Sequence, residues 1–324
     1  MIKTIGTIGI AIAAAMAPLA AISQSFPSRP VKLVVPASAG GVTDIVARAL
    51  AQELGSVWSQ PTIVENRPGA SQIIGAESVA KSSPDGHTLI VSDGSAFVIN
   101  PHLYRKLPYD TLRDFTAIAS ICQVAPVLAV SASLPATTVG ELIAHTKAKA
   151  GGLSYGSVGA GSYMHIAMED FKRRTGTDLV HVPYKGSTPA VNALLAGEIA
   201  TILVHIGTLE QHAKAGKVRL LALATAQRIA SHPNLPTIAE SGVPGFETST
   251  WFGVLGPSGI PREVVKQIHE TMAKLIASHG FRSQYLARFA LEPLNLSVEQ
   301  FNDLMKSDLE RWGPLVKASG ATVD

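Results

Sequence analysis

Short apolar runs alternate with amphipathic stretches along this chain, and that alternation constrains the fold more than any other feature. Residues 31–35 are mostly apolar and are followed by Pro36, which is typical of a buried strand that ends there. Apolar residues then recur on one helical face over residues 44–57. The same order of strand, loop and helix returns at 153–174 and 179–196. This repetition predicts parallel-sheet-rich layers covered by helices, an α/β fold.

Hydroxyl side chains mark where several of the expected helices begin. Thr138 and Ser297 are each followed three residues later by Glu or Gln, which is the spacing of a capping box. Ser162 and Ser187 stand at the expected N-cap positions of two further helices. These signals locate loops between strands and helices, and such loops are where open α/β sheets bind ligands.

The chain is long enough for two lobes with separate cores. Apolar strands at 125–131 and 219–225 lie at the borders of a middle unit and are the expected places for the chain to cross between lobes. We therefore expect residues 26–125 and 228–324 to form lobe 1 and residues 126–227 to form lobe 2. Two lobes joined by two crossover strands make a hinge with a ligand cleft between them.

The first residues have the pattern of a secretory leader. Lys3 is followed by a small apolar stretch at 5–15 and then by Pro18, with small residues before possible cleavage after 23 or 25. The stretch is shorter than the roughly 20 apolar residues of a membrane-spanning helix. We expect residues 1–23 to be a signal peptide and the mature protein to be periplasmic.

Charge and cysteine content exclude several classes of protein. The chain has 27 basic and 24 acidic residues without a basic stripe, so nucleic-acid binding is not expected. Cys122 is the single cysteine, which rules out an internal disulfide, and its apolar surroundings at 118–130 suggest a core residue. No cofactor is expected from these features.

Three glycine- and hydroxyl-rich loops precede expected helices. Glycine lets a ligand approach the backbone closely, and the unpaired N–H groups of a helix start attract a carboxylate without any lysine or arginine. Each loop also has a simpler interpretation as an ordinary turn with a capping residue. The first loop holds Ala39, Gly40, Gly41 and Asp44, the second Ser157, Gly161 and Ser162, and the third Tyr184 and Gly186.

Three histidines are candidates for ligand binding or metal binding. His165 falls in the first turn after the second loop, where it points either into a cleft or onto a lobe surface. His205 ends an apolar strand, at the edge of the sheet where ligands bind, and His181 lies within a strand. No compact set of histidine, cysteine and carboxylate side chains supports a metal site.

An exported hydrolase is the main enzymatic alternative, with Ser157 or Ser162 as nucleophile and His165 as base. Neither serine lies in the Gly-x-Ser-x-Gly pattern of a nucleophile elbow, because Tyr155 and Ala160 occupy the first glycine positions. The phosphate-binding loop and the dinucleotide fingerprint are also missing from the sequence. We therefore expect a binding protein with no catalytic residues.

Many ordered segments resemble one family. They include FPSRP at 26–30, VENRPGA at 64–70, PDGHTL at 84–89, HVPYKG at 181–186 and GVPGF at 242–246. Over nearly the whole mature length, the chain resembles the Bug, or TctC-like, extracytoplasmic solute receptors of tripartite tricarboxylate transporters.

This resemblance implies a periplasmic-binding-protein type of fold that closes around a small organic acid. It also implies the membrane subunits of a tripartite tricarboxylate transporter as partners, and a monomer is expected; a ligand sensor for a signalling partner is the alternative. By resemblance, the ligand carboxylate would be held by the first two loops and by His165. Tyr184 and Gly186 would face the cleft, and Ser92 and Ser95, after the strand at 87–91, would also contact the ligand.

His205 is a departure from the family pattern, which often has Asp there. In related proteins that acid can bind an amino group or the distal part of the ligand. An imidazole favours an anionic or neutral group instead. The expectation is that amino-acid ligands are disfavoured and that simple or aromatic carboxylates are favoured.

Overall fold

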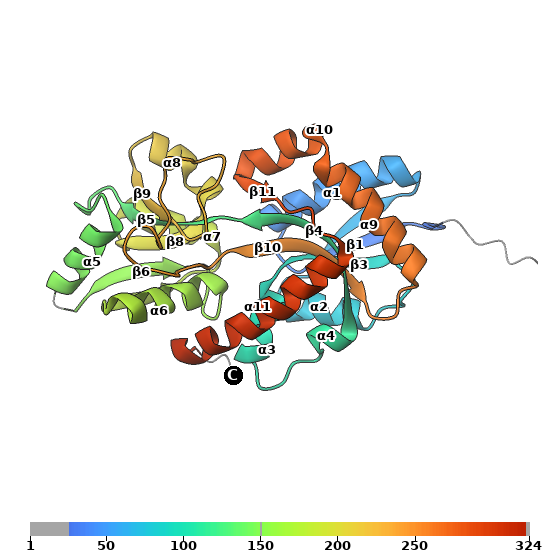
Figure 1. The fold of residues 1–324 in the computed structure, drawn as a ribbon, viewed down its shortest axis with the longest axis horizontal. Helices are drawn as coiled ribbons and strands as arrows, with labels where there is room; N and C mark the ends of the chain where they lie inside the picture. Colours follow the sequence, from blue (N-terminus) through green and yellow to red (C-terminus); the bar gives the residue numbers. More distant parts are fainter. Residues whose placement is uncertain (1–25, 150, 322–324) are drawn as a thin grey trace, which may run out of the picture.

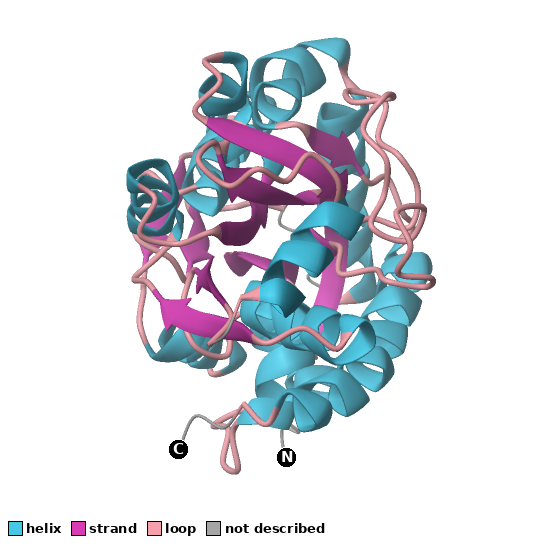
Figure 2. Ribbon diagram, turned by 90° about the vertical axis from the view of Figure 1, so that its left-hand side faces the viewer, coloured by secondary structure: helices cyan, strands magenta, loops and turns pink. Residues whose placement is uncertain are grey.

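The computed structural model describes residues 26–149 and 151–321, and these form two lobes with one sheet each (Figure 1). The expected leader at 1–23 lies outside the described residues. The α/β fold with two lobes is confirmed, but each sheet is mixed and not parallel throughout. Figure 2 shows the strands of both sheets enclosed by helices.

The first sheet has six strands in the order β11-β4-β10-β3-β1-β2. Strand β1 pairs in parallel with β2 and β3, whereas β10 runs antiparallel to both of its neighbours, β3 and β4, and β11 runs antiparallel to β4. The bounds are β1 Val31–Val35, β2 Thr62–Asn66, β3 Thr88–Asp93, β4 Phe115–Val124, β10 Thr250–Pro257 and β11 Leu291–Pro293.

Helices cover both faces of this sheet. One face packs against α1 (Val42–Trp58) and α9 (Arg262–Ala277), which share one buried apolar cluster. The other face packs against α2 (Ile73–Ala80) and α11 (Val298–Ser319). The shorter elements of this lobe are η1 Ala70–Gln72, η2 Ser95–Ile99, α3 Asn100–Leu103, α4 Thr111–Asp114, α10 His279–Phe281, η4 Arg282–Leu286 and η5 Ala287–Phe289.

The second sheet has five strands in the order β7-β6-β8-β5-β9, with β7, β6 and β8 parallel. One face packs against α5 and α6, which share a buried cluster through Leu142 and Phe171, and the other packs against α7 in a second cluster, to which the start of α6 also contributes. The bounds are β5 Pro126–Ser131, β6 Leu153–Ser157, β7 Leu179–Pro183, β8 Thr201–His205, β9 Val218–Leu223, α5 Val139–Ala148, α6 Tyr163–Thr175, α7 Ser187–Ala196, η3 Ile206–Thr208 and α8 Glu210–Lys214.

The chain passes between the lobes at two places (Figure 1). Only Ala125 separates β4 from β5, so one nearly continuous extended segment belongs to both sheets. On the way back, the backbone N–H of Ile238 donates to Leu223 O at 2.7 Å and that of Thr248 donates to Ala224 O at 2.9 Å. These bonds keep the segment after β9 with the second sheet. The return to lobe 1 therefore comes at β10 and not after the expected boundary at residue 227.

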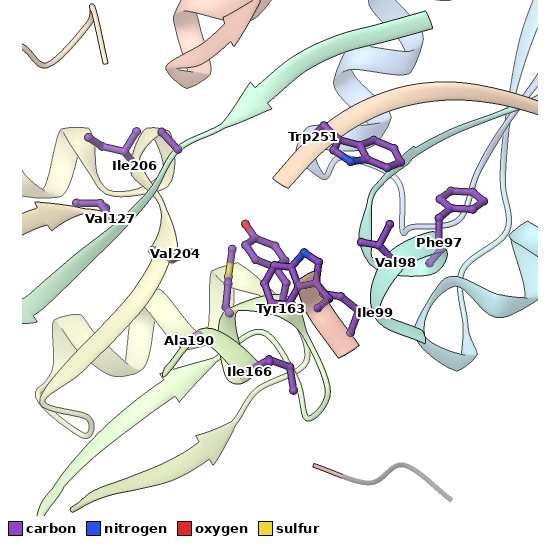
Figure 3. Packing of buried hydrophobic residues seen from close by; sticks show 14 of the residues in the cluster. Phe97, Val98, Ile99, Val127, Tyr163, Ile166, Ala190, Val204, Ile206 and Trp251 are labelled. Carbon is purple, nitrogen blue, oxygen red and sulfur yellow. The ribbon is translucent and has the colours of Figure 1, made fainter. Parts of the chain in front are cut away.

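One apolar cluster joins the two lobes. It contains Trp251 and Trp312 from lobe 1 and Tyr163 and Ile166 from α6 of lobe 2. In Figure 3, Tyr163 lies between β8, which bears Val204, and the η2 segment of lobe 1. Helix α11 therefore packs against η2 on one side and α6 on the other, and its burial depends on both lobes.

Most of the expected helix starts are present. The hydroxyl of Thr138 accepts the N–H of Glu141, and Ser162 accepts that of His165. Ser297 forms the full capping box with Gln300. The expectation for Ser187 was wrong: α7 begins at this residue and its N-cap is Gly186, at φ 107°, without a side-chain cap. Glycine meets the positive φ there at little cost, so no hydroxyl is needed.

Cys122 lies in the core, as the sequence suggested. Its side chain is fully buried in β4, and burial raises the pKa of the thiol well above its usual range. The thiol therefore stays protonated and unreactive.

Replacing Trp312 with Ala tests the joint packing of α11. Trp312 is 1% exposed, so truncation leaves a cavity and is expected to lower the free energy of unfolding by about 3–5 kcal/mol, measured by urea titration. The control is Val57→Ala, at a side chain that is 56% exposed, with an expected change within about 0.5 kcal/mol. A loss at Trp312 no larger than that of the control contradicts this packing.

Candidate functional site

A cavity of about 250 Å³ lies between the lobes. Its walls come from loops at strand ends, as expected for α/β sheets. Lobe 1 contributes Ser71, Gln72, Asp93, Ser95 and Asn100, and lobe 2 contributes residues 158–164, Ser187 and His205. The two walls belong to different sheets, so a molecule in the cavity would touch both lobes at once.

The lobe 2 wall is the loop between β6 and α6. Ser157 ends β6, and its Oγ lies 2.7 Å from His181 Nε2 and accepts the N–H of Gly159 at 3.2 Å. Ser162 donates to Gly159 O at 2.7 Å while it caps α6. Gly159 has a φ of 143° and Gly161 one of 75°, values that side-chain-bearing residues rarely adopt. The two serines therefore hold the loop in its shape.

Two stacked histidines support this loop from behind. The rings of His165 and His181 lie 4.0 Å apart, and Tyr155 stacks on His181 at 4.9 Å. Burial lowers the pKa of His181 to about 4, with a further contribution from His165, and burial also lowers the pKa of His165. Both rings are therefore neutral at pH 7. A neutral His165 can accept at Nδ1, and the N–H of Gly161 donates to that atom at 3.1 Å.

The start of α6 presents unpaired N–H groups to the cavity. Among the described residues, the N–H groups of Tyr163 and Met164 have no acceptor, and both residues line the cavity. Unpaired N–H groups in the first turn carry the positive end of the helix dipole. A carboxylate in the cavity can accept from them without a cationic side chain.

The lobe 1 wall includes a strained turn before α2. Ala70, Ser71 and Gln72 have φ values of 45°, 49° and 76°, although none is glycine. Side chains hold this conformation: Asn100 donates to Ser71 O at 2.8 Å, and the Tyr104 hydroxyl donates to Ser71 Oγ at 2.9 Å. Strain of this kind persists only where surrounding contacts fix it, and it is common at ligand sites.

A second group of polar contacts lies at the end of β3. Gln72 donates through Nε2 to Asp93 at 2.9 Å and accepts at Oε1 from the hydroxyl of Ser92 at 2.7 Å. The N–H of Ser95 donates to the other oxygen of Asp93 at 2.7 Å. Ser92 is fully buried, so it positions Gln72 and does not face the cavity.

His205 faces the cavity from the end of β8. Its ring nitrogens lie 3.2 and 3.3 Å from the Tyr163 hydroxyl. Burial lowers the pKa of His205 to about 4, so the ring is neutral at pH 7. Burial and the nearby charge of Asp93 raise the pKa of Tyr163, which keeps its hydroxyl protonated.

The structure separates the expected site residues into three groups. The residues that line the cavity are Ser95, Gly161, Ser162 and His205. Those that support the walls are Ser92, Ser157 and His165. The remaining residues lie outside the cavity lining: Ala39, Gly40, Gly41, Asp44, Tyr184 and Gly186.

Asp44 has a structural role in the first loop. Its carboxylate accepts from Gly40 N at 2.9 Å, from Arg48 at 2.9 Å and from Asn66 at 2.9 Å. Burial alone raises the pKa of Asp44, but these hydrogen bonds outweigh it and leave the pKa below its usual range. The loop that carries Gly40 and Gly41 is exposed to solvent beside the strand end.

Six residues of the cavity wall lie outside the loops and sites expected from sequence. These residues are Ser71, Gln72, Asp93, Asn100, Tyr163 and Met164. Asp93 could have been predicted from the sequence, because it is an acidic residue at the end of a buried strand. The turn at 70–72 had none, since nothing in its residue types predicts a left-handed backbone.

Two mixed sheets joined by two crossings, with loops from both sheets lining one polar cavity, define a two-lobed solute-binding receptor. The model of the tripartite tricarboxylate transporter family receptor matches residues 46–321, and the chain belongs to this family. The BugT protein of Bordetella pertussis is 33% identical over 99% of this chain and 98% of its own length.

Two solved structures are similar over nearly their whole length. The R. palustris protein Rpa4515 with adipate is 36% identical, with a TM-score of 0.84 over 92% of this chain and 99% of that one. MatC from Rhodopseudomonas palustris with bound malate is 28% identical, with a TM-score of 0.80 over 90% of this chain and 100% of that one. The family consists of solute receptors, and its relatives work in the periplasm.

The buried histidines predict a pH dependence of stability. An unfolded histidine gains a proton below about pH 6.5, whereas folded His181 gains one only near a pKa of about 4. The unfolded chain binds more protons between these values, so the free energy of unfolding falls as pH falls through this window. His181→Gln keeps a hydrogen-bonding group beside Ser157 and removes the titration. The melting temperature of this variant should depend less steeply on pH than that of the wild type, and an equally steep dependence contradicts the assignment.

Proposed function

We propose that this protein is exported to the periplasm, captures a small organic carboxylate between its two lobes, and delivers it to the membrane subunits of a tripartite tricarboxylate-type transporter. The observation that carries this proposal is the pair of unpaired N–H groups, on Tyr163 and Met164, at a cavity wall. Donors of this kind suit a carboxylate. The bound adipate and malate of the two similar structures support the same ligand class.

Capture depends on the hinge. A ligand carboxylate on the α6 side leaves the rest of the molecule facing Gln72, Asp93 and Ser95 across the cavity. Contacts to both walls exist only when the lobes are close together, so the ligand stabilises the closed form. The cavity loops are fixed by internal hydrogen bonds, which limits the ordering cost of binding.

The lobes already touch at the side opposite α11. A Cβ added at Gly207 of η3 would lie 2.6 Å from the carbonyl oxygen of Phe289 in η5. This close approach needs a glycine, and it brings lobe 2 against lobe 1. The closed arrangement therefore includes direct contacts between the two lobes, in addition to those that a ligand would make.

Membership of the receptor family supports the proposed export and delivery. The expected leader at 1–23 would place the mature chain beside the membrane subunits, and no helix within residues 26–149 and 151–321 has the length and apolar character needed to cross a bilayer. A sensory partner is the alternative use of the same loaded receptor. The fold does not favour one partner over the other, and the family supports the transporter.

The hydrolase alternative gains no support from the geometry. Ser157 is fully buried, and the oxygen of Ser162 is engaged as a helix cap and as a donor to Gly159. His165 Nδ1 accepts the N–H of Gly161, so it is not available as a base at that atom. An active nucleophile needs an accessible oxygen beside a free base.

Thermal-shift screening of mature protein against organic acids tests the proposed function. A ligand that binds only the native state must raise the melting temperature, and saturation to about 100 times the dissociation constant adds about 2.7 kcal/mol. We expect at least one short carboxylate to give a saturable increase. Binding of a solute without an acidic group, with no increase for any acid, contradicts the proposal.

Ser162→Ala tests the cavity wall itself. Loss of the cap is expected to cost about 1 kcal/mol of stability, and loss of the serine's bond to Gly159 should loosen the loop and weaken ligand binding severalfold. The control is Thr138→Ala, which removes the cap of α5 in the same lobe, outside the cavity lining. It should lower stability by a similar amount and leave affinity unchanged. Equal affinities for the two variants would count against the α6 wall as the carboxylate site.

A further inference from the structure

Asp93 is the one acidic side chain in the lining of the cavity. It ends β3 and is partly exposed. Each of its carboxylate oxygens accepts one hydrogen bond from the protein, from Ser95 N and from Gln72 Nε2. An ionised carboxylate offers about four acceptor positions in all. Asp93 therefore keeps acceptor capacity that a ligand can use.

Within residues 26–149 and 151–321, no lysine or arginine side chain lines the cavity to balance this charge. Among the described residues, Asp93 forms no ion pair, and the cavity lining contains neither lysine nor arginine. The neighbouring groups are neutral, since His205 is unprotonated at pH 7 and the Tyr163 hydroxyl keeps its proton. A second carboxylate beside Asp93 would meet repulsion in surroundings of reduced dielectric.

The two walls thus differ in the charge they accept. The start of α6 attracts an anion through the N–H groups of Tyr163 and Met164. Asp93, from the opposite lobe, attracts a cation or a hydrogen-bond donor. A molecule with a negative end and a positive end would be attracted by both walls. A dicarboxylate would be attracted only by the start of α6.

We infer that the favoured ligand is a short ω-amino acid, with its carboxylate on the α6 wall and its ammonium group on Asp93. This inference rests on the proposed function and names the ligand class. It replaces the expectation, drawn from His205, that amino-acid ligands are disfavoured. That expectation took only the lobe 2 wall into account. The small cavity also favours a short chain.

Matched pairs of ligands test the inference directly. Each pair has one chain length and differs only in one end: γ-aminobutyrate against succinate, δ-aminovalerate against glutarate, and ε-aminocaproate against adipate. Calorimetric titration of the mature wild-type protein at pH 7 measures each dissociation constant. In the pair that binds best, the amino member is expected to bind about tenfold more tightly or better, the size of effect that an uncompensated charge contact gives.

Variants of Asp93 assign the preference to this side chain. Asp93→Asn removes the charge and should reduce the preference about tenfold, while Asp93→Glu keeps the charge and should retain it. The control is Asp303→Asn, which removes an acidic side chain on α11 that is 77% exposed and outside the cavity. It should leave the ratio of the two dissociation constants unchanged. The melting temperature of each ligand-free variant checks that the protein folds.

The outcomes separate this inference from the proposed function. If the dicarboxylates bind as tightly as their amino partners, or Asp93→Asn keeps the wild-type ratio in a folded protein, the inference is wrong and the receptor for organic acids still stands. If none of the six acids binds in the titration while a solute without a carboxylate does bind, the inference and the proposed function are both wrong.

Discussion

A single residue, Ala125, separates β4 of the first sheet from β5 of the second, and this short connection limits how the lobes can move. The return path through β10 gives a second fixed crossing, and α11 packs on both lobes beside it. With two extended crossings and a shared apolar cluster, the lobes can rotate about the hinge but cannot separate. The strand ends of both sheets therefore always face the same space, and every polar group of the site depends on that arrangement.

Within this frame, the polar groups of both cavity walls are held in place by side chains of their own lobe. On lobe 2, the rings of a tyrosine and two histidines stack, and a serine bonded to one histidine helps to fix the glycine loop before α6. On lobe 1, Asn100 and Tyr104 fix a turn with left-handed backbone. Neither wall needs ligand to adopt its shape, so binding energy goes into closing the hinge. The resulting cavity has N–H donors on one side and a carboxylate on the other, an asymmetry that favours one orientation of the ligand.

The sequence predicted the lobes, the strands and most helix starts, because these depend on local patterns of apolar residues and capping hydroxyls. It predicted the β6–α6 loop as a site for the same reason, since glycines beside a capped helix are visible in the sequence. The missed features depend on long-range contacts. The positive φ values at residues 70–72 are supported by distant side chains: Asn100 and Tyr104 bond to Ser71 and Asp93 bonds to Gln72. The segment around Ile238 lies with lobe 2 through bonds to β9, which no local pattern indicates.

Hydrogen exchange of backbone amides, with and without the tightest-binding acid, tests the central claim most directly. The account predicts that ligand slows exchange at the start of α6, above all at Tyr163 and Met164, and at the end of β3 in the other lobe, where Ser95 lies. Protection should appear in both lobes together because the ligand bridges them. Protection confined to the hollow between α9 and the start of α11, with the cavity loops unchanged, would contradict the account.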